Sequence, residues 1–127
     1  MNQEKAATTK GLVSNFQETV NKIGTQSPRP VGLGLAHGSM YTLIYRPHNP
    51  DDQQPHEQDE LYIAMSGSGT IVVDDERHPF GTGDMIFVPA HAVHRFEDFT
   101  DDLLLWVVFY GPKGGESVTP VNAEDSH

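Results

Sequence analysis

The amino-acid sequence predicts an all-β domain, a barrel or a sandwich, with one short helix near the N-terminus. From residue 31 onward, short runs rich in β-branched and aromatic residues alternate with turns marked by glycine, proline and aspartate. Many short strands with almost no helix are typical of such closed architectures. The sequence contains no internal repeat, so we expect one barrel rather than two. The expected strands cover residues 31–36, 39–46, 60–66, 69–74, 84–88, 93–98 and 102–110.

The single helix is expected to begin near Ser14, where the residues have the spacing of a capping box. Phe16, Val20 and Ile23 follow on one helical face, and Gly24 ends the pattern. We expect this helix to cover or flank the barrel. Contact with a second subunit is the alternative.

The chain is expected to divide into three parts, an N-terminal extension (1–30), a barrel (31–113) and a polar C-terminal tail (114–127). The first nine residues are polar and are expected to be disordered. The last eleven, from Ser117, are expected to be mobile for the same reason.

Composition narrows the possible partners and the location. The chain has 127 residues, and its 18 acidic and 8 basic residues give a net charge of −10, which repels phosphate backbones and anionic lipids. We therefore expect no nucleic-acid partner and no membrane partner. The chain contains no cysteine, and its N-terminus has no apolar signal region. Its longest apolar run, residues 103–110, is only eight residues long. These features favour a cytoplasmic protein.

A polar segment leads into the third expected strand. Residues two or four apart on a strand share a face, so Gln54, His56 and Glu60 are expected to point inward, with Tyr62 and Ala64 beyond them. An inward glutamate in an apolar barrel is unfavourable unless it is paired or bound to a cation. We therefore expect Glu60 to bind a metal ion. The alternative is a structural ion pair with an interior arginine or histidine.

A second segment supplies another histidine. A turn, a short strand and a tight proline connection precede His94, which begins the next expected strand. If both segments belong to one barrel, His56, Glu60 and His94 converge on a single metal ion. His91 lies in the connection and is expected at the rim of the site without binding the ion. The remaining histidines are expected at the surface, at the rim or in the tail, namely His37, His48, His78 and His127.

The two segments resemble the paired motifs of the cupin superfamily over roughly residues 38–112. The first family motif is G-x5-H-x-H-x3,4-E-x6-G, and the second is G-x5-P-x-G-x2-H-x3-N. The fifteen residues between the two matches are a short spacer, similar to that of small single-domain microbial cupins. The matching residues are, in chain order, His56, Glu60, Gly67, Gly83, Pro89 and His94.

This resemblance implies a double-stranded β-helix, the jelly-roll barrel of small single-domain members of the cupin 2 type, with one divalent transition metal ion. The ion would be Fe, Mn, Ni, Cu or Zn. The ligands carried over are His56, Glu60 and His94, with Gln54 as a weak fourth donor in place of a family histidine. Two histidines and one carboxylate with open positions also match the non-haem iron(II) oxygenases.

The chain departs from the motifs at other positions too. His48 and His91 stand where the family has glycine, and Asp98 stands where it has asparagine. Because a glutamine carbonyl is a weaker donor than imidazole, Gln54 would leave positions open to water or substrate. Inward rotation of His91 to replace the missing imidazole, and loss of the metal altogether, are the alternatives.

The pattern favours a small organic molecule in the barrel, bearing a carboxylate, hydroxyl or enol group. One hypothesis is a metal-dependent enzyme of the dioxygenase, isomerase or lyase type, with Tyr62 or His91 as candidate catalytic residues. The other is a non-catalytic module for a small ligand or a sugar, with or without a degenerate metal site. The side chains expected around the ligand are Tyr62, Phe87, Phe96, Trp106 and Phe109, with Arg95 near the edge.

A homodimer is expected, since small barrels of this superfamily often pair through edge strands and an N-terminal segment. The strand at 31–36 or the helix from Ser14 to Ile23 is expected to form the contact. Covering an edge strand would also satisfy its free backbone groups.

Overall fold

Antiparallel pairing organises the chain into two β-sheets. The computed structural model describes residues 8–117. Its elements, in chain order, are α1 (Phe16–Asn21), β1 (Val31–His37), β2 (Met40–Tyr45), β3 (Asp59–Ser66), β4 (Gly69–Val73), β5 (Glu76–Phe80), β6 (Met85–Val88), β7 (His94–Glu97) and β8 (Leu104–Tyr110).

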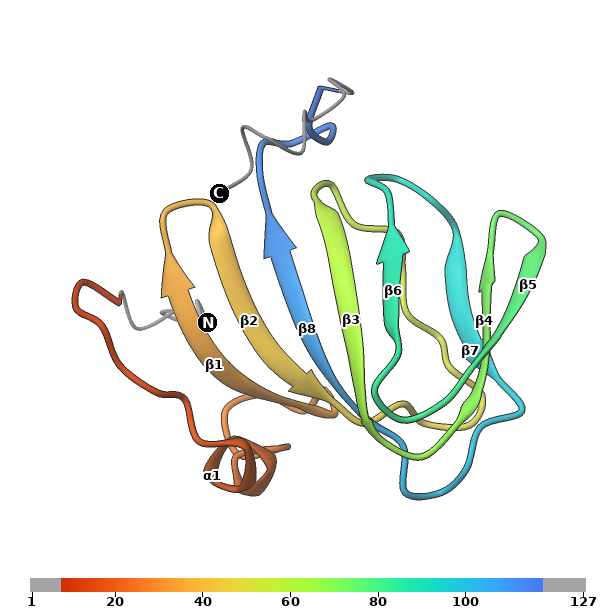
Figure 1. Cartoon of the computed structure of the whole chain (residues 1–127), viewed down its shortest axis with the longest axis horizontal. Helices are drawn as coiled ribbons and strands as arrows, with labels where there is room; N and C mark the ends of the chain where they lie inside the picture. Colours follow the sequence, from red (N-terminus) through yellow and green to blue (C-terminus); the bar gives the residue numbers. More distant parts are fainter. Residues whose placement is uncertain (1–7, 118–127) are drawn as a thin grey trace.

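The strand order is β1-β2-β8-β3-β6 in the larger sheet and β5-β4-β7 in the smaller one (Figure 1). From β3 onward the chain passes repeatedly between the sheets, since β4 and β5 belong to the smaller sheet, β6 to the larger, β7 to the smaller and β8 to the larger. This exchange of strands between two antiparallel sheets is the jelly-roll arrangement. It confirms the all-β, double-stranded β-helix fold expected from the sequence.

Side chains of β3 alternate between the interior and the exterior. Glu60, Tyr62 and Ala64 are almost completely buried, whereas Leu61 and Ile63, which point the other way, are half-buried. The register pairs Leu61 with a residue of β6 and a residue of β8, so the outward positions of the three strands share one face. The same alternation therefore builds the core and aims Glu60 into the barrel.

The helix packs on the outer face of the larger sheet, beside β1 (Figure 1). Phe16 meets Trp106 edge-to-face, with ring centroids 6.1 Å apart. The helix is shorter than expected, and its N-cap is Asn15 rather than Ser14, because the Asn15 side chain accepts a hydrogen bond from the backbone N–H of Glu18.

The sequence reading missed strand β5. Charged residues and Pro79 make Glu76–Phe80 look like a loop, and only its last side chain is buried. The strand forms because Asp74 and Asp75 adopt φ values of 46° and 71°, the left-handed geometry of a tight two-residue hairpin. It borders the smaller sheet, where an exposed proline is tolerated.

Most of the expected terminal disorder lies outside the described residues. Thr8, which belongs to the expected disordered segment, bonds with the backbone of Ala36 on β1. Residues 118–127, including His127, belong to the tail that was expected to be mobile. Among residues 8–117, no helix combines the length and apolar character that crossing a membrane requires.

We expect the substitution Gly32→Ala to destabilise the domain by about 1–3 kcal/mol, the usual range for overpacking. A Cβ atom at this position would overlap the carbonyl oxygen of Thr19 on α1, so the helix would have to move. Urea denaturation measures the change. Gly11→Ala is the control, because a Cβ atom there meets nothing within 4 Å. Equal stability of the two variants would contradict close packing of α1 on β1.

Candidate metal centre

Three potential ligands meet inside the barrel. His56 lies in the irregular segment before β3, Glu60 lies on β3, and His94 is the first residue of β7. One donor atom from each lies within 4.8 Å of the others. Glu60 and His94 are 1% and 2% exposed, so water contributes little to solvating either group.

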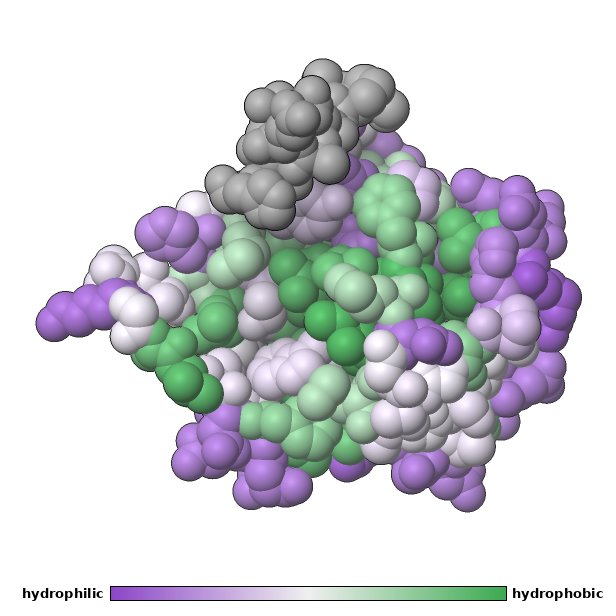
Figure 2. All heavy atoms as spheres, in the orientation of Figure 1, coloured by the Kyte–Doolittle hydropathy of each residue, from purple (hydrophilic) through white to green (hydrophobic). Residues whose placement is uncertain are grey.

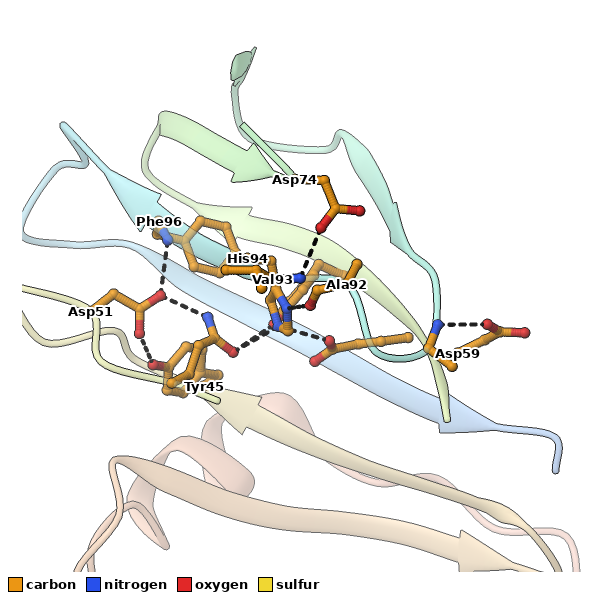
Figure 3. A network of polar contacts seen from close by, with 12 residues as sticks. Tyr45, Asp51, Asp59, Asp74, Ala92, Val93, His94 and Phe96 are labelled. Atoms are coloured by element: carbon orange, nitrogen blue, oxygen red, sulfur yellow. Dashed lines mark hydrogen bonds and ion pairs between the residues drawn. The ribbon is translucent and has the colours of Figure 1, made fainter. Parts of the chain in front are cut away.

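Hydrogen bonding fixes the ring of His94. Its Nδ1 lies 2.9 Å from the carbonyl oxygen of Ala92 and donates to it, because a carbonyl only accepts (Figure 3). In the neutral ring the lone pair is therefore on Nε2. This arrangement, with one nitrogen anchored to a carbonyl and the other directed into the site, is usual for a metal-binding histidine.

Two oxygen atoms face Nε2 of His94. Glu60 Oε1 and Gln53 Oε1 each lie 3.1 Å from it. The amide of Gln53 cannot be reversed, because its nitrogen donates to Oδ2 of Asp51 at 2.6 Å, and a carboxylate only accepts. The hydroxyl of Tyr62 also donates to the Gln53 oxygen, at 3.0 Å.

These contacts leave an electrostatic conflict at the centre of the cluster. Neutral His94, ionised Glu60 and Gln53 all present acceptors to the same small volume. Glu60 Oε1 has no hydrogen-bond partner among the described residues, since its short contact with His94 lacks hydrogen-bond geometry. A buried carboxylate oxygen in this state needs a proton, on Glu60 or on His94, or a metal ion.

Glu60, His94 and Gln53 fit a metal ion in both chemistry and spacing, and a donor atom of His56 lies within 4.8 Å of those of Glu60 and His94. Two ligands bound side by side to an ion at about 2.1 Å are roughly 3.0–3.4 Å apart, and the contacts to His94 Nε2 have this separation. Imidazole nitrogen with carboxylate oxygen suits Zn, Fe, Mn, Ni or Cu. The described residues therefore fit a divalent transition metal without rearrangement of the Glu60, His94 and Gln53 contacts.

Asp51 holds the amide and joins the two sheets. This buried carboxylate accepts hydrogen bonds from the hydroxyl of Tyr45 at the end of β2, from Gln53 and from the backbone N–H of Phe96 on β7 (Figure 3). Because donors surround it, Asp51 is satisfied as an anion. Its contacts tie the segment before β3 to both sheets.

Other carboxylates hold the connection between β6 and β7, which carries His94. Asp59 accepts from the backbone N–H of Ala90, and Asp74 accepts from that of Val93 (Figure 3). The backbone N–H of His91 donates to the carbonyl of His56 at 2.7 Å. These bonds fix the segments that supply His56 and His94 relative to each other.

The pKa values of the two histidines are shifted in opposite directions. Burial alone would lower the pKa of His94, but the close contact with the Glu60 carboxylate and the hydrogen bond to the Ala92 carbonyl raise it overall. Burial lowers the pKa of His56, although the charge of Glu60 opposes this change. Burial also raises the pKa of Tyr62 well above its ordinary value of 10.0, so this phenol keeps its proton at neutral pH.

A cavity of about 180 Å³ opens beside the cluster. His56, Glu60, Gln53 and Tyr62 form its polar wall. Much of the rest is apolar, and the exposed residue Arg29 also lines the cavity. A volume of this order accommodates a ligand about the size of benzene.

Gln54, expected as the fourth donor, does not reach the cluster. Its side chain is exposed, and its amide nitrogen donates to the carbonyl of Asp52. The prediction extended strand alternation backwards from Glu60, but β3 begins only at Asp59 and the preceding segment is irregular. Gln53 occupies the expected place instead.

His91 is exposed and does not line the cavity, which leaves it outside the cluster. Two of the motif departures reflect backbone geometry instead. His91 has φ of 68° and Asp98 has φ of 51°, the region that glycine adopts easily and that asparagine and aspartate tolerate.

Only some of the expected aromatic lining is found. Tyr62 and Phe109 line the cavity, and Phe96 packs behind Tyr62 in the core. Phe87 and Trp106 point outward, because they pair with the outward residues of β3. Arg95 does not lie at the edge of the cavity as expected. It lies between the inward residues His94 and Phe96 on β7, so its side chain points outward, where it forms an ion pair with Glu97.

The sequence reading missed Gln53, Asp51 and Arg29. All three lie in irregular segments, where no periodicity assigns a side chain to a face. Asp51 carried one usable signal, since it lies in the polar loop directly before a recognised metal motif. Arg29, between two prolines, had no such signal.

The comparisons with known proteins agree with the fold and the motifs. The sequence model of the cupin domain matches residues 42–110, more than half of the chain, and the chain belongs to the cupin family. An uncharacterized protein of Streptomyces coelicolor is 40% identical over 63 residues, which are 50% of this chain and 60% of that protein. Dimethylsulfoniopropionate lyase DddW of Ruegeria pomeroyi is 33% identical over 73 residues, 56% of this chain and 43% of the lyase.

The chain thus spans less than two thirds of the length of either relative. Among solved structures, iron(II) HppE superposes with a TM-score of 0.53 at 20% identity, covering 63% of this chain and 48% of that one. At this identity the likeness shows a shared fold.

In the metal-free protein, we expect NMR titration to place the His94 pKa above 6.5 and the His56 pKa below it. Protonated His94 then stabilises the fold fully below pH 6.5, and this contribution is lost as the pH rises through the folded-state pKa. Glu60→Gln should lower the pKa of His94, because the amide removes the negative charge beside the ring. An unchanged His94 titration in this variant would contradict the contact.

Proposed function

We propose that the protein is a metal-dependent cupin enzyme acting on a small organic molecule, by oxygenase, isomerase or lyase chemistry. The observation that carries the proposal is the buried Glu60 oxygen, which faces His94 in a ligand-sized cavity and has no hydrogen-bond partner among the described residues. A divalent ion satisfies this oxygen and the Nε2 lone pair of His94 together.

The proposed ligands are His56, Glu60 and His94, with the amide oxygen of Gln53 as the fourth donor. Asp51 orients Gln53 through the amide nitrogen, as an outer carboxylate commonly orients a metal ligand. The bound ion would supply Lewis acidity toward an oxygen of the substrate or a site for oxygen chemistry. Because His56, Glu60 and Gln53 line the cavity, a substrate in the cavity would lie beside the bound ion.

The candidate catalytic residue within the cavity is Tyr62. Its raised pKa keeps the phenol protonated, so it would act as a hydrogen-bond donor or proton source rather than a base. His91 is less suited, because it is exposed and lies outside the cavity. The names of the relatives, a lyase and an iron(II) protein of the same fold, support an enzyme with a metal.

A non-catalytic binding module is the second candidate. The observation in its favour is the 3.1 Å contact between His94 and Glu60, which protonation of His94 would stabilise as a buried ion pair without any metal. In that case the cluster would be a structural network in the wall of a small-ligand site. Metal content separates the two candidates.

We expect elemental analysis of the purified protein to find about one Fe, Mn, Ni, Cu or Zn ion per chain, with loss of the ion in His94→Ala. Gln53→Ala should weaken the affinity for Zn²⁺ about ten- to hundredfold, the range seen when metal-site partners are removed. Isothermal titration calorimetry measures this affinity.

Gln54→Ala is the matched control, since it removes the neighbouring exposed amide and should retain wild-type affinity. Far-UV circular dichroism checks the fold of each variant. If the wild-type protein binds none of these ions after reconstitution, the metalloenzyme proposal is overturned and the binding-module candidate remains. Equal losses in the Gln53 and Gln54 variants would argue against Gln53 as a donor.

We also propose that the barrel forms a homodimer and acts in the cytoplasm. Figure 2 shows apolar surface gathered over the middle of the larger sheet, and β6 is an edge strand. Phe87 and Met85 on β6 are 54% and 65% exposed. This face is a better candidate for the contact than the helix, whose apolar side already packs on the sheet.

Light scattering at micromolar concentration should give the mass of two chains for the wild type and of one chain for Phe87→Glu, because burying the new charge is unfavourable. Leu12→Glu, at another exposed apolar residue near the helix, should remain dimeric. Dissociation by the Leu12 variant alone would move the contact to the N-terminal segment, and a monomeric wild type would exclude the dimer.

A further inference from the structure

We propose that Arg29 is the anion-recognition residue of the cavity, so that the substrate class is a small organic carboxylate with a second oxygen function. This inference rests on the proposed function for the role of the metal, but the contact with the carboxylate belongs to Arg29 itself. The expected ligand has its anionic group at Arg29 and its second oxygen toward His56 and Glu60.

Arg29 is the cation that faces this cavity. It lines the cavity beside the metal cluster and also the neighbouring surface pocket, and both share Tyr45, Gln53 and His56. Burial raises the pKa of Tyr41 and Tyr45, and the positive charge of Arg29 opposes this rise. The guanidinium therefore acts electrostatically on side chains of the cavity wall.

The guanidinium has no ion pair among the described residues. The arginines of the smaller sheet are different, because Arg77 binds Glu97 and Asp98, and Arg95 binds Glu97. Although the chain carries a net charge of −10, no carboxylate within the described residues neutralises Arg29. An exposed arginine without an ion pair in the lining of a cavity suits bidentate recognition of a carboxylate.

The backbone at Arg29 is held in place before any ligand arrives. Pro28 and Pro30 restrict the chain on both sides. The N–H of Arg29 donates to Ser27 Oγ at 3.1 Å, and its carbonyl accepts from Val31 at 2.8 Å. The carbonyl of Pro30 accepts from Arg46 at 3.0 Å. A fixed backbone lowers the entropy lost when the side chain binds an anion.

The residues of the cavity wall indicate the size and polarity of the rest of the ligand. Val31, Leu33, Leu43 and Val107 form an aliphatic surface, and Phe109 adds an aromatic one. At about 180 Å³ the space suits a molecule of roughly benzene size. A divalent ion bound by one glutamate keeps a net positive charge, which together with Arg29 favours an anion over a neutral molecule.

The test compares acids with their neutral amides. Butyrate, 3-hydroxybutyrate and 4-hydroxybutyrate, each paired with its primary amide, are titrated into the protein as purified and after addition of Zn²⁺. Changes in ¹H–¹⁵N NMR spectra report binding with or without metal. We expect the wild type to prefer each acid about tenfold or more, the effect of a charge-assisted hydrogen bond. The hydroxy acids should gain further affinity when Zn²⁺ is present.

Arg29→Gln should reduce the preference for acid over amide to about twofold or less while leaving Zn²⁺ affinity unchanged. Arg46→Gln is the matched control, because Arg46 is exposed and does not line the cavity, yet its loss changes the net charge equally. The control should retain the preference. Retention of the preference in Arg29→Gln, its loss in both variants, or failure of every acid to bind the wild type at millimolar concentration would overturn the proposal.

The two proposals fail separately. A wild type that binds no metal but prefers acids through Arg29 would leave the anion site intact and remove the metalloenzyme. A wild type that binds one metal ion but has equal affinity for acids and amides would retain the proposed metal site and exclude the anion site at Arg29.

Discussion

The arrangement of the site depends on three acceptors that meet within a few ångströms inside the barrel. The Nε2 lone pair of His94, the carboxylate of Glu60 and the amide oxygen of Gln53 can share this space only with a proton or a metal ion among them. Each orientation is fixed from outside the cluster, His94 by a backbone carbonyl and Gln53 by Asp51. The barrel therefore holds its donors in position at the expense of leaving them electrostatically incomplete.

The parts of the fold that follow strand alternation were predictable from the sequence. The inward position of Glu60 and the paired motifs ending in His94 came from period-two patterning and spacing, and the structure brings both residues together. Prediction failed where the chain is irregular. Gln53 faces His94 in place of the expected Gln54, because the segment before Asp59 is not a strand. Strand β5 was missed because it depends on two aspartates with positive φ rather than on apolar residues.

Charge is distributed unevenly through this acidic protein. Buried Asp51 and Asp59 accept hydrogen bonds from several donors and serve the architecture. Glu60 differs, because one of its oxygens has no such donor among the described residues. The contrast separates carboxylates that hold segments in place from the one that is available for chemistry, and that distinction is not visible in the composition.

The position of Asp51 couples the two sheets of the barrel to the polar cluster inside it. Its carboxylate bonds Tyr45 on one sheet and Phe96 on the other, and the same group orients the amide of Gln53. Any displacement of one sheet relative to the other would therefore change the orientation of the amide oxygen that faces His94. The packing of the two sheets and the geometry of the polar cluster are thus linked through one carboxylate.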